Sequence, residues 1–168
     1  MKKIWTLICL SVFSASLTCC GIYSFTGADT GEATTFQVNF FQNNAQLVEP
    51  QLDIDFTRAL QDLIQNQTNL TLVTSDGDLV YEGEITQYRI EPMTATAQNT
   101  AAQNRLTIAV NVRYFNTLDD EKDFEQTFSF FYDYPADALL TGSTKDAAFE
   151  EIFERLTQDI FNASLANW

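Results

Sequence analysis

The side chains best placed for chemistry are carboxylates, because the 168 residues include 23 Asp and Glu but no histidine. Without histidine, the commonest general base, the Ser-His-Asp and Cys-His arrangements and the usual zinc sites are all excluded. Glu82 and Glu84 would share one face of a strand about 7 Å apart, and glycoside hydrolysis could use such a pair. Two solvated glutamates are the favoured interpretation, so we expect no enzyme.

A second acidic group lies at Asp119, Asp120, Glu121 and Asp123. Carboxylates at this density could hold calcium, but the segment has no glycine at a bend and no terminal glutamate at EF-hand spacing. It is better interpreted as an exposed hairpin tip. No Walker or dinucleotide motif is present either. We therefore expect neither a metal site nor a cofactor.

Two arginines, Arg105 and Arg113, are candidates for binding. Arg113 falls on the polar side of an alternating segment, 106–115. An arginine on an open sheet face could bind a phosphate or a carboxylate. The favoured alternative is a surface ion pair with a neighbouring strand, for example with Glu125.

The N-terminus has the pattern of a secretory signal peptide over residues 1–19. Lys2 and Lys3 precede a short apolar run, and Leu17 stands three positions before Cys20. The run is shorter than the roughly 20 residues of a membrane span. Its end resembles a lipobox, which predicts cleavage before Cys20 and lipidation of that cysteine.

Lipidation at Cys20 would leave no thiol for a disulfide or a catalytic nucleophile, since Cys9 and Cys19 are removed with the signal peptide. An acylated cysteine, which typically carries a diacylglyceryl group and an amide-linked acyl chain, anchors a protein stably to a membrane. Gly21 in the second position favours the outer membrane by the enterobacterial sorting rule. We expect the protein to face the periplasm there.

The mature chain suits one domain of residues 34–168 behind a lipidated tether of residues 20–33. The net charge of the whole chain is −14, and loss of Lys2 and Lys3 takes it to −16. A chain this acidic has no basic patch for nucleic acid and no electrostatic attraction to an anionic bilayer. Contact with the membrane is therefore expected through the lipid anchor.

Hydrophobic periodicity predicts an α+β fold, a two-layer sandwich with two helices on one face of a mainly antiparallel four- to five-stranded sheet. The opposite face should be polar and open. The predicted strands cover 34–41, 70–73, 79–90, 106–115 and 124–134, and the predicted helices cover 53–67 and 145–165.

Three local details follow from the same patterns. Alternation places Phe36, Val38 and Phe40 on one buried face. The apolar phase changes after Ile85, which predicts either a β-bulge or a strand that leaves the core at this point. Ser143 or Thr144 is expected to cap the last helix.

The segment directly after the lipobox, Cys20-Gly21-Ile22-Tyr23-Ser24-Phe25-Thr26-Gly27, resembles the mature start of the LptE family of lipopolysaccharide-assembly lipoproteins, in the form found in Bacteroidetes. Further stretches resemble the family in the same order along essentially the whole mature chain. They are Thr68–Val73, Gly77–Leu79, Glu82–Thr86, Asn104–Ile108, Asp123–Phe128, Ile160–Asn162 and Asn167-Trp168.

This resemblance implies an outer-membrane lipoprotein that plugs the barrel of LptD, the lipopolysaccharide translocon, and helps it assemble. The family has no catalytic residues. Some members bind lipopolysaccharide through basic residues, which makes Arg105 and Arg113 the possible contacts with lipopolysaccharide or the partner here. The alternative is a general periplasm-facing lipoprotein that binds another envelope component.

Overall fold

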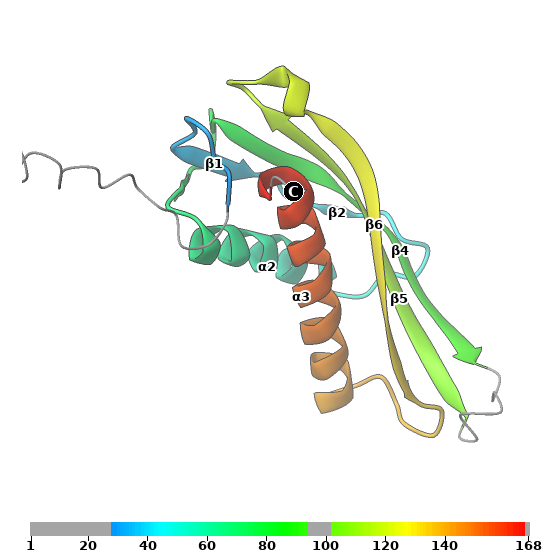
Figure 1. The fold of residues 1–168 in the computed structure, drawn as a ribbon. Helices are drawn as coiled ribbons and strands as arrows, with labels where there is room; N and C mark the ends of the chain where they lie inside the picture. Colours follow the sequence, from blue (N-terminus) through cyan, green and yellow to red (C-terminus); the bar gives the residue numbers. More distant parts are fainter. Residues whose placement is uncertain (1–27, 94–101, 167–168) are drawn as a thin grey trace, which may run out of the picture.

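The computed structural model describes residues 28–93 and 102–166, so residues 1–19, Cys20 and most of the predicted tether lie outside the described residues. Two helices pack on one face of a single sheet (Figure 1), which confirms the predicted α+β sandwich. The sheet has six strands rather than four or five. The elements are β1 Thr35–Val38, β2 Gln42–Asn43, α2 Leu52–Gln67, β3 Thr71–Leu72, β4 Leu79–Met93, β5 Gln103–Asn116, the 3-10 turn η1 Asp120–Lys122, β6 Phe124–Pro135 and α3 Ser143–Leu165.

The sheet is mixed, with the strand order β3-β1-β4-β5-β6 and with β2 beside β4. The three long strands β4, β5 and β6 form an antiparallel meander. The short strands run parallel to their neighbours, β1 to both β3 and β4, and β2 to β4. Helix α2 connects β2 to β3, so it supplies the crossover that lets these strands run parallel.

The predicted bulge is confirmed, because the register of β4 against β5 shifts between Ile85 and Gln87. One extra residue in β4 moves the buried side from Ile85 to Tyr88. Beyond the bulge the hairpin of β4 and β5 extends past the short strands (Figure 1).

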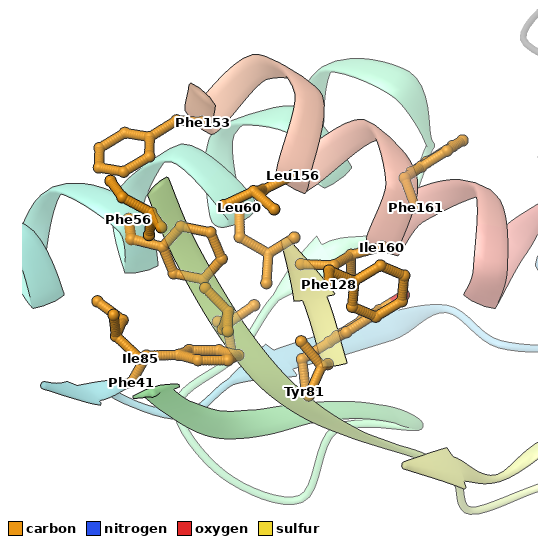
Figure 2. Close-up of a cluster of buried hydrophobic side chains, with 14 of the residues drawn as sticks. Phe41, Phe56, Leu60, Tyr81, Ile85, Phe128, Phe153, Leu156, Ile160 and Phe161 are labelled. Carbon is orange, nitrogen blue, oxygen red and sulfur yellow. The ribbon is translucent and has the colours of Figure 1, made fainter. Parts of the chain in front are cut away.

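The core lies between the sheet and the two helices (Figure 2). Phe56 of α2 contacts Phe41 and Phe153 edge-on, with ring centroids 5.2 and 5.7 Å apart. The apolar residues that recur at helical spacing along α3 are all buried, and they are Phe149, Ile152, Phe153, Leu156 and Ile160. The Tyr81 hydroxyl donates to Ser164 Oγ of α3 at 2.9 Å, so the core is also tied by a polar contact.

The prediction that Phe40 is buried is wrong. Strand β1 ends at Val38, and Phe40 is 53% exposed while Phe41 is fully buried. The Phe41 N–H donates to Thr57 Oγ1 of α2 at 3.2 Å, and the Thr57 hydroxyl donates to the Asp53 carbonyl at 2.7 Å. The hydrogen bond to α2 therefore fixes the chain after β1, so that Phe41 rather than Phe40 points into the core.

The predicted cap of α3 is also wrong. The helix begins at Ser143 itself, behind Gly142 at a positive φ of 54°, and no side-chain hydrogen bond caps this end. Close to this end, Lys145 Nζ lies 2.9 Å from Glu49 Oε1, which fastens the loop after β2 to the first turn of α3. The hydrogen bond to Glu49, with the charge of its carboxylate, raises the pKa of Lys145.

Candidate interaction surface

The open face of the sheet carries a connected polar network that joins the residue after β1 to β4 and β5. Asn39 Nδ2 donates to Glu82 Oε2 at 3.3 Å, and Arg113 Nε donates to Glu82 Oε1 at 3.1 Å. Arg113 Nη1 lies 3.7 Å from Glu84 Oε1. The hydrogen bond from Arg113 to Glu82 raises the pKa of the guanidinium. The open face is thus polar around Arg113, where the charges of Glu82, Glu84 and Arg113 are paired, while Phe115 and Phe131 are exposed elsewhere on the same face.

Arg113 has the ion pair with a neighbouring strand that we favoured, but the partners are Glu82 and Glu84 on β4. Glu125, the suggested partner, lies opposite Arg113 in the register of β5 and β6. It instead accepts a hydrogen bond from Asn111 Nδ2 at 2.8 Å. The two glutamates considered for catalysis therefore share one arginine.

Arg105 lies in a separate cluster on the same face. Its Nε and Nη2 donate to the two carboxylate oxygens of Asp133 at 2.7 and 2.8 Å. The guanidinium carbon lies 3.6 Å from the ring centroid of Phe131, and the hydrogen bond to Asp133 raises the pKa of Arg105. Arg105 and Arg113 are eight positions apart on β5, about 27 Å by strand rise. The structure does not bring the two candidate arginines together.

The acidic segment after β5 forms a turn. Asp123 Oδ1 accepts the N–H of Asn116 at 2.7 Å, and Lys122 Nζ lies 4.0 Å from Asp119 and 3.8 Å from Asp29. Over residues 28–93 and 102–166, no cluster of three or more Asp, Glu, Cys or His side chains could hold a metal ion. The segment works as the tip of the β5–β6 hairpin.

The chain enters the domain beside the C-terminus of α3. The Asp29 N–H donates to the Leu165 carbonyl at 2.6 Å, and Ala28 forms an antiparallel bridge with Ala166. The last residues of β4 and the first residues of β5 lie at the opposite end of the molecule (Figure 1). Helix α3 alone has 23 residues, or about 34 Å. Neither described helix is long and apolar enough to cross a membrane.

Asp78, which the sequence analysis did not single out, ties the start of β1 to the turn before β4. Its Oδ2 accepts the N–H groups of Thr34 and Thr35, both at 2.9 Å, and the Thr34 hydroxyl at 3.0 Å. These bonds, first that from the Thr34 N–H, lower its pKa to about 2. The sequence does contain a sign of this contact, the Asp76-Gly77 turn directly before Asp78. Such a turn can place the next residue beside a neighbouring strand.

Comparisons with known proteins agree with this fold. The family model for lipopolysaccharide assembly, LptE, matches residues 33–164. The hypothetical protein CT253 from Chlamydia trachomatis has a similar structure, with a TM-score of 0.55 and 10% identity over 80% of this chain and 99% of that one. PelC from Paraburkholderia phytofirmans, a dodecamer, gives 0.50 and 7% over 83% of this chain and 95% of that one. Identities this low show the fold alone.

No curated protein sequence matches the chain. The family model, in contrast, spans most of its length and both layers of the sandwich. The family consists of non-enzymatic, envelope-associated lipoproteins. The chain belongs to the LptE family of lipopolysaccharide-assembly lipoproteins.

Proposed function

We propose that this chain is an outer-membrane lipoprotein, acylated at Cys20, that partners and plugs an LptD-type β-barrel during lipopolysaccharide transport. Membership of the lipopolysaccharide-assembly family supports a role in lipopolysaccharide assembly. The barrel partner, the plugging role and the outer membrane go beyond family membership and rest on the surface of the domain. The observation that carries it is the polar network of the open sheet face.

The open face suits the lumen of a barrel. Interiors of outer-membrane barrels are polar and water-filled, so a plug needs a surface that is stable against water and polar walls. The open face provides such a surface, because its polar side chains form one network of hydrogen bonds and ion pairs. The members of this network are Asn39, Glu82, Glu84 and Arg113. A face with unpaired charges would cost more to bring against a wall.

The point at which the chain enters the domain favours a defined orientation. Cys20 precedes Ala28 by eight residues, so the anchor lies within about 28 Å of Ala28 even when the tether is fully extended. Ala28 is fixed to the C-terminal end of α3. We therefore place this end of the domain toward the anchoring leaflet, with the last residues of β4 and the first residues of β5 away from it.

Direct contact with lipopolysaccharide, if made through Arg105 or Arg113, has to compete with carboxylates. Arg105 is paired with Asp133, and Arg113 is paired with Glu82 and Glu84. A phosphate of lipopolysaccharide would have to displace these partners. The arrangement favours contact with the barrel as the main role of the open face, with lipopolysaccharide as a weaker ligand.

Depletion of the chain from its own cells tests the proposed function. We expect less lipopolysaccharide at the cell surface and a lower level of correctly assembled barrel, both restored by the wild-type chain. Restoration should fail with Cys20→Ala, whose product should also lack the added mass of the acyl groups. Normal surface lipopolysaccharide after depletion would contradict the proposal and favour a lipoprotein that binds another envelope component.

A further inference from the structure

Among the described strands, none pairs with the outer edge of β6 at any point along its length. β6 is the last strand in the order β3-β1-β4-β5-β6, and no strand in the described part of the chain pairs with its second edge. In an antiparallel sheet, every second residue of such a strand directs its N–H and C=O away from its neighbour. The 12 residues of β6 therefore offer a row of free backbone groups roughly 40 Å long.

This edge has few of the features that normally block strand addition. Exposed edges are usually protected by lysines, internal prolines, bulges or very short strands. β6 contains no lysine, and its only proline is its last residue, Pro135. Its register against β5 runs without a shift from Phe124 to Pro135. The edge is regular enough to accept another strand.

A hollow of about 530 Å³ adjoins this edge on the helix side. It is lined by Tyr132 of β6 and by Ala147, Glu150, Glu151, Glu154 and Arg155 of α3. On the other side of the edge, Phe131 is 41% exposed. Strand addition takes its affinity from main-chain hydrogen bonds and its specificity from pockets for alternate side chains. Here the hollow can receive the side chains that an added strand directs toward α3.

The acidic side chains around the hollow favour a basic strand as the ligand of this edge. Glu150, Glu151 and Glu154 are exposed on α3, and Arg155 is the one basic residue lining the hollow. Arg155 lies over the Phe130 ring at 5.6 Å. The glutamates would attract lysine or arginine side chains of an added strand.

A second copy of this chain fits the edge poorly. The antiparallel register that pairs two β6 strands over Phe124–Tyr134 is centred on Ser129. That register sets Glu125 of each copy opposite Asp133 of the other, and like charges directly opposite each other destabilise a strand pair. It also brings two acidic α3 surfaces toward one another.

We propose that the outer edge of β6 binds an extended, basic segment of a partner protein by strand addition, with alternate lysine or arginine side chains entering the hollow beside Glu150 and Glu154. The proposal rests on the proposed function, because it names the surface through which this lipoprotein would hold its partner. The edge of β6 would then be a second contact surface, in addition to the open face of the sheet.

The test uses the full lipidated chain in detergent and a short peptide that alternates lysine with valine. We expect hydrogen exchange of alternate β6 amides to slow by about tenfold or more at saturating peptide. A peptide that alternates glutamate with valine should have no effect. The double variant Glu150→Lys/Glu154→Lys should weaken binding by about tenfold or more.

The matched control is Asp62→Lys/Glu121→Lys, which changes the net charge equally at exposed positions on α2 and η1 and should bind the lysine peptide like the wild type. The proposal is overturned by unchanged β6 exchange, by equal weakening in both variants, or by β6 protection that grows with protein concentration alone, which would indicate self-pairing. Recovery of a barrel from membranes together with unprotected β6 amides would leave the proposed function standing and remove this edge as its site.

Discussion

The Phe41 ring occupies the space that a side chain at Gly83 would need: a Cβ built on Gly83 would lie 2.7 Å from Phe41 Cε1 and would overlap the Asn111 carbonyl oxygen. Phe41 is fully buried against Phe56 of α2. The missing side chain in β4 is therefore what lets the segment after β1 pack onto the sheet.

Gly83→Ala should lower the free energy of unfolding by about 2–3 kcal/mol, because an overpacked core must shift backbone or rings. Urea denaturation followed by circular dichroism measures the effect. The control is Ser129→Ala on the exposed part of β6, which should change stability by less than about 0.5 kcal/mol. A Gly83→Ala protein as stable as the wild type would show that neither Phe41 nor the Asn111 carbonyl oxygen restricts this position.

Thr57 links α2 to the chain at Phe41 through a single hydroxyl. Thr57→Val keeps the shape but leaves the buried Phe41 N–H without an acceptor, so it should cost about 1–3 kcal/mol. Thr57→Ser retains the hydroxyl and should recover most of that loss. Equal stability of the two variants in thermal unfolding would contradict the role of the hydrogen bond.

Asp78 makes stability depend on pH in the acid range. Its pKa is about 2 in the folded protein against an ordinary value of 3.8. A lowered pKa means that its contribution is complete above about pH 4 and is lost as the pH falls toward 2. Asp78→Asn should remove this part of the dependence and destabilise the protein at pH 7.

The matched control is Asp76→Asn. Asp76 has a positive φ of 55° that asparagine tolerates. Denaturation midpoints between pH 2 and pH 7 compare the two variants. The Asp76→Asn protein keeps the Asp78 carboxylate and should lose more stability on acidification than the Asp78→Asn protein. An equal loss in the two variants would show that the Asp78 carboxylate does not stabilise the start of β1.

Arg113 should bind lipopolysaccharide better when its partners are neutralised. Glu82→Gln/Glu84→Gln removes both carboxylates from its side chain. Exposed pairs of this kind contribute up to about 1 kcal/mol, so we expect affinity to rise about three- to fivefold. Fluorescence titration with lipopolysaccharide measures it, and adding Arg113→Ala should abolish the gain. A gain that survives Arg113→Ala would exclude this arginine as the contact.

Most of the fold could be predicted from the sequence because its long segments have a clear hydrophobic periodicity. The helical periodicity of α2 and α3 and the alternation of β5 depend on local spacing; the apolar residues concerned are buried in α3 and β5, and buried or half-buried in α2. The parallel pairing of β1 with β3 and β4 depends on the α2 crossover, which strand patterns do not encode. Phe40 was misplaced for a related reason, since contacts with Thr57 and the gap at Gly83 override alternation.

The surface was harder to predict than the core. Alternation correctly placed Arg113 on the open face, but the identity of its partners depends on which strand lies beside β5 and in what register. Asp78 lies in a turn, where its bonds to Thr34 and Thr35 are contacts across more than forty residues of sequence. A glycine inside a strand, such as Gly83, was the one readable sign of a close approach.

Affinity purification of the lipidated protein from membranes tests the central claim most directly. Mass spectrometry of the eluate should find a large outer-membrane β-barrel of LptD type, in a fixed ratio to the chain and retained in high salt. Cys20→Ala should reduce its recovery, since an unanchored domain is no longer held at the membrane. An eluate without a barrel, or with a different envelope protein in fixed ratio, would contradict the claim.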